Sequence, residues 1–133
     1  GFGFQSFDLM PRVTALDNVM RPLEISGDRY AMDKAQEALE QVGLSKRSKH
    51  FATQLSGGEK QRVAIARSIV NKPKILFADE PTGNLDIKSS GAITDLLFSL
   101  KELINTTLVL VTHDLSLAEK CEEVFELSEG QLL

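Results

Sequence analysis

The sequence predicts an α/β fold with a parallel sheet at its core. Two almost continuous apolar runs, residues 75–78 and 108–111, have the length of buried strands. Between them, apolar residues recur at helical spacing over residues 88–104. Strands that alternate with helices in this way form parallel sheets. Apolar runs this continuous are expected when helices cover both faces of the sheet.

The first half of the chain is expected to be mainly helical. Residues 1–5 have the pattern of a strand end, and a loop with a short helix near residues 15–20 is expected to follow. An amphipathic helix is expected over residues 31–42, because its apolar residues recur at helical spacing and Gly43 suits its end.

Caps and turns indicate the remaining elements. A helix is expected to begin at Ser56, because Ser56 and Glu59 have the spacing of a capping box. After the second apolar run, a short helix is expected, and then two short strands around a turn at Glu129-Gly130. These last elements fall at residues 115–121, 124–127 and 131–133.

Composition limits the classes of protein to which the chain can belong. Its 133 residues fit one compact domain at most, and 42% of them are hydrophobic. The net charge of -4 argues against a nucleic-acid partner, since nucleic-acid binders usually carry a basic face. No apolar run approaches the roughly 20 residues that a membrane-spanning helix needs. The one cysteine, Cys121, rules out an internal disulfide.

Polar residues follow both predicted strands directly. Asp79 and Glu80 end the first strand, and His113 follows the second. Ligands bind at the carboxyl edge of open α/β sheets, where adjacent strands would bring these side chains together. Asp79 could hold Mg²⁺, Glu80 could polarise an attacking water, and His113 could donate a hydrogen bond to a phosphate oxygen. A solvated acidic turn after a core strand remains the alternative.

The run Leu55-Ser56-Gly57-Gly58-Glu59 places two glycines in the first turn of a helix. Backbone amides at a helix start carry partial positive charge and bind phosphate, and glycine allows a close approach. Each glycine costs about 1 kcal/mol of helix stability relative to alanine. This cost indicates a role besides helix formation, although an ordinary capped helix stays possible.

In this order, the motifs resemble those of the ATP-binding cassette (ABC) transporter ATPases over nearly the whole chain. The signature motif is the run at residues 55–59, and the Walker B strand is residues 75–79. The runs at residues 4–11, 14–19 and 79–86 resemble one branch, which holds the LolD lipoprotein-releasing ATPase, MacB-type exporters, antimicrobial-peptide exporters and the FtsE division protein. The forms of the D-loop and of the signature at residues 57–61 look most similar to LolD. The other matching segments are the Q-loop Gly3-Phe4-Gln5, the catalytic glutamate Glu80, the D-loop Gly83-Asn84-Leu85-Asp86 and the switch histidine His113.

The resemblance implies a partial P-loop NTPase fold in three parts. Residues 1–5 would end the Q-loop strand, residues 6–70 would form a helical subdomain with the signature motif, and residues 71–133 would form the C-terminal part of a RecA-like ATPase core. No G-x-x-x-x-G-K-[ST] motif occurs, so the N-terminal strands and the phosphate-binding Walker A loop would be missing through truncation. Residues 1–133 alone are therefore expected to bind ATP weakly and to expose apolar sheet surface.

The resemblance also implies an ATPase that acts as a head-to-tail homodimer with Mg²⁺. Integral membrane permease subunits would be the further partners, at the cytoplasmic face of the inner membrane, and nucleic acid would not be one. The roles carried over fall on a limited set of residues. The nucleotide held by the partner would be bound by Ser56, Gly57, Gly58 and Glu59, and the metal would be bound by Asp79 and Gln5. Catalysis would depend on Glu80, His113 and Gln5. The D-loop at the dimer interface would contain Asn84 and Asp86.

Several functions stay open at this point. Lipoprotein release is the first expectation, and macrolide or peptide export and an FtsE-like role are alternatives within the same branch. A soluble ABC ATPase outside transport would carry a long insertion between Gln5 and Leu55, but that interval is 50 residues (55 - 5), which fits a transporter. A non-catalytic module would be expected to replace Glu80 or His113, and both are present.

Overall fold

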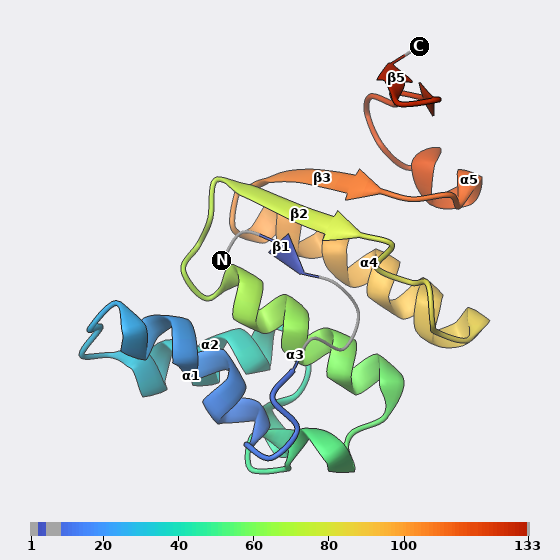
Figure 1. The fold of residues 1–133 in the computed structure, drawn as a ribbon. Helices are drawn as coiled ribbons and strands as arrows, with labels where there is room; N and C mark the ends of the chain where they lie inside the picture. Colours follow the sequence, from blue (N-terminus) through green and yellow to red (C-terminus); the bar gives the residue numbers. More distant parts are fainter. Residues whose placement is uncertain (1–2, 5–8, 133) are drawn as a thin grey trace.

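A three-stranded parallel sheet lies at the centre of the structure, a computed structural model that describes residues 3–4 and 9–132 (Figure 1). Its strands are β1 (Gly3–Phe4), β2 (Ile75–Asp79) and β3 (Thr107–Val111), in the order β1-β2-β3. The register between β2 and β3 runs from Ile75 opposite Thr107 to Asp79 opposite Val111. The predicted parallel sheet is confirmed.

Two long helices pack along this sheet. Helix α3 (Gly57–Ile69) leads into β2, and α4 (Ile87–Leu103) connects β2 to β3. Because the strands follow one another in order across the sheet, right-handed crossovers place both helices on the same face. Helix α3 contacts β1 and α4, and α4 contacts β3, as the layers in Figure 1 show.

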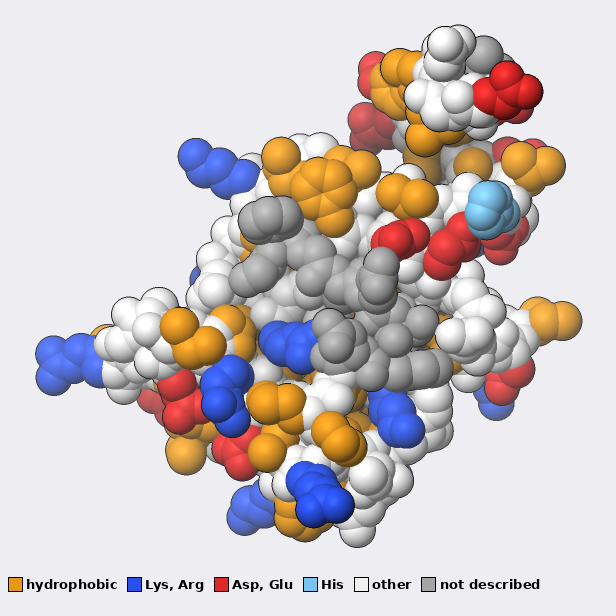
Figure 2. All heavy atoms as spheres, viewed as in Figure 1, with side chains coloured by type: hydrophobic (Ala, Val, Ile, Leu, Met, Phe, Trp, Pro, Cys, Tyr) orange, Lys and Arg blue, Asp and Glu red, His pale blue; other side chains and the backbone are white. Residues whose placement is uncertain are grey.

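The other face of the sheet differs from the expectation of helices on both sides. Leu76 and Ala78 are buried beneath the helices, whereas Ile75 and Phe77 are 44% and 41% exposed. Successive side chains of a strand point to opposite faces, so this alternation marks one covered and one open face. Figure 2 shows hydrophobic side chains on the surface above the sheet. In the described part of the chain, β2 therefore has one helical layer and exposes apolar side chains on its other face, as the sequence predicts for residues 1–133.

Helices α1 (Ala15–Ile25) and α2 (Ala31–Gln41) pack against α3. The helix expected near residues 15–20 is longer than predicted and continues through Pro22 to Ile25. Proline removes one backbone donor from a helix. The apolar stripe of Ala15, Val19 and Leu23 is almost fully buried against the neighbouring helices, and this burial compensates for the lost bond.

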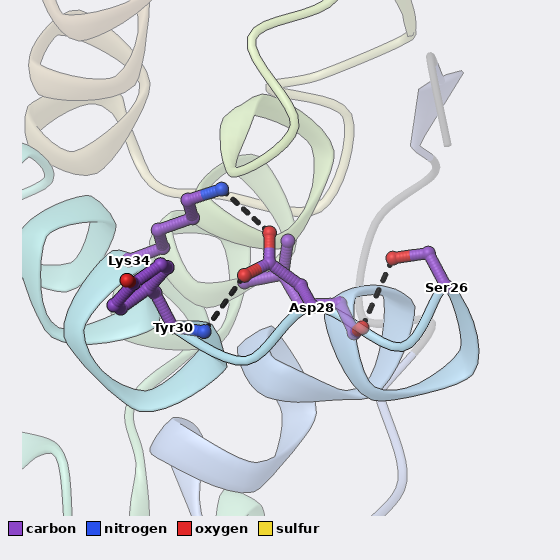
Figure 3. A network of polar contacts seen from close by, with 5 residues as sticks. Ser26, Asp28, Tyr30 and Lys34 are labelled. Atoms are coloured by element: carbon purple, nitrogen blue, oxygen red, sulfur yellow. Dashed lines mark hydrogen bonds and ion pairs between the residues drawn. The ribbon is translucent and has the colours of Figure 1, made fainter.

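The turn between α1 and α2 is held by a small polar network (Figure 3). One carboxylate oxygen of Asp28 accepts a hydrogen bond from the backbone N–H of Tyr30 at 2.8 Å, and the other pairs with the Lys34 ammonium. The Ser26 hydroxyl donates to the carbonyl of Leu23 at 3.0 Å. The hydrogen bond from Lys34, followed by that from Tyr30, lowers the pKa of Asp28. These contacts connect the turn with the first helical turn of α2.

One cluster of buried apolar side chains connects the helices with the sheet. It contains Leu39 of α2, Ile65 of α3, Leu76 of β2 and Leu97 of α4, each 0% exposed. The predicted division into residues 1–5, 6–70 and 71–133 stays a prediction.

The C-terminal residues form a small unit that stands apart from the sheet in Figure 1. Helix α5 (Leu115–Ala118) is shorter than the helix expected over residues 115–121. Strands β4 (Leu127–Ser128) and β5 (Gln131–Leu132) form an antiparallel hairpin around the expected turn, where Glu129 and Gly130 both have positive φ. Two such residues match the strand twist in a tight hairpin.

Within residues 3–4 and 9–132, no helix has both the length and the apolar character that crossing a membrane requires.

Candidate functional site

The carboxyl ends of β2 and β3 bring the predicted acidic residues and His113 together. Asp79 is the last residue of β2 and lies opposite Val111 of β3. The backbone N–H of Glu80 donates to the carbonyl of Val111 at 2.7 Å, which extends the ladder by one bond beyond the strand. The prediction that adjacent strands place His113 near Asp79 and Glu80 is confirmed for Glu80 by direct contacts.

The Glu80 carboxylate is held by residues that follow β3. Its Oε1 accepts from the backbone N–H of His113 at 2.9 Å, and its Oε2 accepts from the Thr112 hydroxyl at 3.3 Å. The His113 imidazole Nε2 lies 3.6 Å from Oε1 and its side chain is fully exposed, at 100%. Figure 2 shows acidic side chains beside a histidine at this end of the sheet. These hydrogen bonds fix the direction of the Glu80 carboxylate, and the exposed His113 imidazole beside it is accessible to a ligand.

The donor set at this edge fits a magnesium ion with phosphate ligands. Mg²⁺ prefers carboxylate oxygens and usually takes one or two of them together with substrate phosphates and waters. Asp79 is half-buried at the strand end and supplies such an oxygen beside Glu80. Among the described residues, no group of three or more His, Cys, Asp or Glu side chains is arranged as a complete metal cage. The second predicted metal ligand, Gln5, lies outside the described residues.

The N-terminus of α3 has the capping box that the sequence predicts. The Ser56 hydroxyl accepts from the Glu59 backbone N–H at 3.1 Å, and the Glu59 carboxylate accepts from the Ser56 backbone N–H at 2.9 Å. The guanidinium of Arg47 donates to the same carboxylate at 3.1 Å. The backbone bond from Ser56, and then the contact with Arg47, lower the pKa of Glu59.

This cap leaves the first-turn amides of α3 directed out of the helix. Gly57 and Gly58 are its first two residues, and amides at such positions have no carbonyl partner within the helix. Gly57 is exposed and Gly58 is half-buried against α4. A β-carbon on Gly58 would lie 3.3 Å from the Ser89 Oγ. The arrangement can bind an anion, and a methyl group at position 58 would also touch Ser89 of α4.

The residues of the predicted D-loop lead into α4. Asp86 is the N-cap of that helix, and its carboxylate accepts from the Ser89 backbone N–H at 2.7 Å. This backbone bond is the main cause of a lowered pKa of Asp86. Asn84 is exposed beside it. The capping role of Asp86 was not predicted, although an aspartate directly before a helical pattern is a common N-cap.

One buried contact that sequence analysis missed connects α3 with the turn after β2. The Gln61 side chain is 0% exposed, and its Nε2 donates to the carbonyl of Pro81 at 2.7 Å. A signal was present in the sequence, because Gln61 stands in the same i, i+4, i+8 stripe as Ile65 and Ile69. A glutamine in an apolar stripe predicts a buried amide with a specific partner.

Comparison with known proteins gives the family of the chain. Residues 1–83 match the family model described as ABC transporter. The chain is 52% identical to the uncharacterized ABC transporter ATP-binding protein YbbA of Escherichia coli K12, over 99% of the chain and 59% of that protein. It is 51% identical to the lipoprotein-releasing system ATP-binding protein LolD of Bdellovibrio bacteriovorus, over 98% of the chain and 60% of that protein. The chain thus spans about three fifths of the length of these relatives.

Solved structures share the fold. The dimeric, post-hydrolysis ATP-binding cassette MJ0796 bound to ADP and Pi is 39% identical, with a TM-score of 0.82 over 98% of this chain and 60% of that chain. A putative metal-chelate type ABC transporter in an inward-facing conformation is 26% identical, with a TM-score of 0.90 over 98% of this chain and 55% of that chain. The predicted α/β fold of the ABC ATPases is confirmed.

Proposed function

The chain belongs to the ABC transporter family, and from this membership we propose that its protein hydrolyses ATP to drive a membrane transporter. The observation that carries the proposal is the anchored Glu80 carboxylate beside the exposed His113 imidazole, at the sheet edge that Asp79 also reaches. Phosphoryl transfer needs an oriented water and groups that neutralise phosphate charge. These residues supply both.

In this mechanism, the residues of one chain have separate tasks. Glu80 orients the attacking water and accepts its proton, because its carboxylate is held by His113 N–H and the Thr112 hydroxyl while 37% of the side chain stays exposed. The His113 imidazole donates to an oxygen of the transferred phosphoryl group. Asp79 and Gln5 would hold a magnesium ion, whose charge would lower the repulsion among phosphate oxygens.

A second copy of the protein completes each nucleotide site. The amides of Gly57 and Gly58, with the Ser56 hydroxyl, bind the γ-phosphate held by the partner subunit, and Glu59 contributes by holding Ser56 in the capping box. Asn84 and Asp86 lie in the loop that crosses the interface. Support comes from the dimeric form of the related cassette MJ0796 with ADP and Pi. In the head-to-tail arrangement, helix α3 of one subunit, which begins with the signature motif, faces Glu80 of the other subunit.

The transported substrate is proposed from the relatives. LolD proteins of Bdellovibrio and Xanthomonas, 51% and 48% identical, are named as ATP-binding proteins of a lipoprotein-releasing system. Release of lipoproteins by a complex with integral membrane permease subunits is therefore the first proposal, with the ATPase peripheral at the cytoplasmic face of the inner membrane. Macrolide or peptide export and an FtsE-like role are the alternatives. They stay open because YbbA, which is named as uncharacterized, is about as similar to this chain as LolD is.

The first experiment measures ATP hydrolysis by the full gene product, meaning residues 1–133 with any sequence that the reading frame encodes on either side. The Glu80→Gln variant is expected to lose about 10²–10⁴-fold in kcat, the usual contribution of a general base, and to keep ATP binding. Glu126→Gln, at an exposed glutamate before β4, is the matched control and should keep its activity. Equal turnover by Glu80→Gln and wild type would contradict the proposal.

The second experiment identifies the substrate. The full gene product is purified with the permease that copurifies with it and is reconstituted in vesicles that contain a lipoprotein. ATP-dependent release of the lipoprotein supports the first proposal. If no lipoprotein is released and a macrolide or a peptide stimulates ATP hydrolysis, the result favours the exporter alternative.

A further inference from the structure

Gln61 carries a buried amide that is only half satisfied. Its side chain lies one turn beyond Gly57 in α3 and is 0% exposed. Its Nε2 donates to the Pro81 carbonyl at 2.7 Å, whereas its Oε1 is buried without a hydrogen-bond partner. An unpaired buried amide oxygen opposes folding, and an apolar side chain of similar size would avoid that penalty. The hydrogen bond to the Pro81 carbonyl is the interaction of this amide that an apolar side chain could not make.

The carbonyl that Gln61 holds belongs to the residue directly after Glu80. Glu80 has a φ of 46°, in the left-handed region that a non-glycine residue adopts only when its surroundings enforce it. Three contacts do so here. The Glu80 N–H donates to the Val111 carbonyl at 2.7 Å, the Gly83 N–H donates to the Glu80 carbonyl at 3.1 Å, and Gln61 holds the Pro81 carbonyl from the side of α3.

We propose that Gln61 is a positioning residue for ATP hydrolysis, which sets the direction of the Glu80 carboxylate through the Pro81 carbonyl. The inference rests on the proposed function of Glu80 as general base. Gln61 itself is assigned no contact with the nucleotide or with the attacking water. The contact with Val111 holds the Glu80 turn to the sheet, and the contact with Gly83 lies within the turn itself. Gln61 restrains the turn from the helical layer.

The position of Gln61 also connects the two functional parts of the chain. Helix α3 begins with the amides of Gly57 and Gly58, and a β-carbon on Gly58 would lie 3.3 Å from Ser89 in α4. The same helix therefore carries the anion-binding amides at its start and the restraint on the Glu80 turn one turn later. A movement of α3 on phosphate binding would move the Pro81 carbonyl with it.

The test replaces the amide by a side chain of similar size that cannot donate. In the full gene product, Gln61→Met is expected to lower kcat about tenfold, since misplacement of a reacting group by about 1 Å costs up to about 10²-fold. The KM for ATP should stay within about twofold, because the Gln61 side chain donates to the Pro81 carbonyl and not to a group that binds the nucleotide. Thr94→Val is the control, as the Thr94 hydroxyl is also buried but donates within α4, to Ser90 at 2.9 Å.

A second variant keeps the test decisive if Gln61→Met does not fold. In Gln61→Glu, a protonated carboxyl can donate to the Pro81 carbonyl, but an ionised one cannot. Burial raises the pKa of a carboxyl group, so a share of this side chain stays protonated near neutral pH. The ratio of kcat for Gln61→Glu to kcat for wild type should rise as pH falls from about 8 to about 6. A ratio that stays as low as that of Gln61→Met at every pH between about 6 and 8 overturns the proposal.

Three results separate the possible failures. A wild-type product without ATPase activity overturns the proposed function, and the role of Gln61 with it. An active wild type together with an unchanged kcat in Gln61→Met overturns the positioning role alone. If kcat of Gln61→Met falls only in proportion to the loss of folded protein, as is expected for Thr94→Val, the positioning role is also overturned. The lower kcat would then be an effect of stability. A tenfold loss of kcat in fully folded Gln61→Met, restored in part by Gln61→Glu at low pH, supports the proposal.

Discussion

The Glu80 carboxylate accepts a hydrogen bond from the backbone N–H of His113 at 2.9 Å, while the His113 imidazole stands 3.6 Å from the same oxygen and is open to solvent. The two contacts have different origins. The first uses the main chain and depends on the register of β2 and β3, and the second uses the side chain. A substitution at His113 can therefore remove the imidazole and leave the carboxylate anchored.

His113→Ala is expected to lower kcat for ATP hydrolysis about 10²-fold, which is typical for the loss of one donor to a developing negative charge. ATP binding should change little, because Glu80 keeps its bonds to the His113 N–H and to Thr112. Steady-state hydrolysis and equilibrium binding of a fluorescent ATP analogue measure both quantities. His50→Ala, at the other histidine, is the control. Wild-type turnover in His113→Ala would exclude the imidazole from the mechanism.

Gly58→Ala is expected to separate stability from function. Alanine favours the helix by about 1 kcal/mol over glycine. The new methyl group would meet the Ser89 Oγ at 3.3 Å, a contact that rotation of the hydroxyl relieves. Thermal unfolding should therefore show an unchanged or slightly raised Tm, while ATP hydrolysis falls because the methyl group blocks phosphate approach. The double variant Gly58→Ala/Ser89→Ala removes the clash, and recovery of hydrolysis in it would attribute the defect to packing instead.

Glu59 gives the protein a pH-dependent contribution to stability. Its folded-state pKa lies below the ordinary value of 4.5, mainly because the Ser56 N–H donates to the carboxylate. The unfolded chain therefore binds a proton at a higher pH than the folded protein does. The stabilisation is present above about pH 4.5 and is lost as pH falls through the depressed pKa.

Tm measured against pH in the acid range tests this contribution. Glu59→Gln keeps the acceptor oxygen of the cap but does not titrate, so its Tm should fall less steeply than that of wild type below about pH 4.5. Glu126→Gln, at an exposed glutamate, should follow the wild-type curve. Parallel curves for Glu59→Gln and wild type would show that the capping box adds nothing to the acid response.

Asp86 joins a structural role with a proposed interface role, and two variants separate them. Asp86→Ala removes the acceptor for the Ser89 N–H and should lower Tm through loss of the α4 cap. Asp86→Asn keeps an acceptor and should keep most of that Tm. If Asp86 also acts across the dimer interface through its charge, both variants lower ATP hydrolysis to a similar degree. Activity that follows Tm across the two variants would limit Asp86 to capping.

Local sequence signals were sufficient for several parts of this fold. The capping box of Ser56 and Glu59 and the turn at Glu129 and Gly130 depend on residues close in the chain, and both are present in the structure. The strands β2 and β3 follow from short apolar runs. In contrast, Pro22 hid the second half of α1, because the burial that stabilises the helix there comes from α2 and α3.

By itself, the sequence determined the family, the order of the elements and the residues that stand at the strand ends, because motifs and local hydrogen bonds are encoded in neighbouring positions. Only the tertiary structure decided which face of β2 the helices cover and that Gln61 holds Pro81 across 20 residues of chain. The physical reason is that a buried amide and an uncovered strand face depend on which distant segments pack against them, and no local pattern specifies that partner.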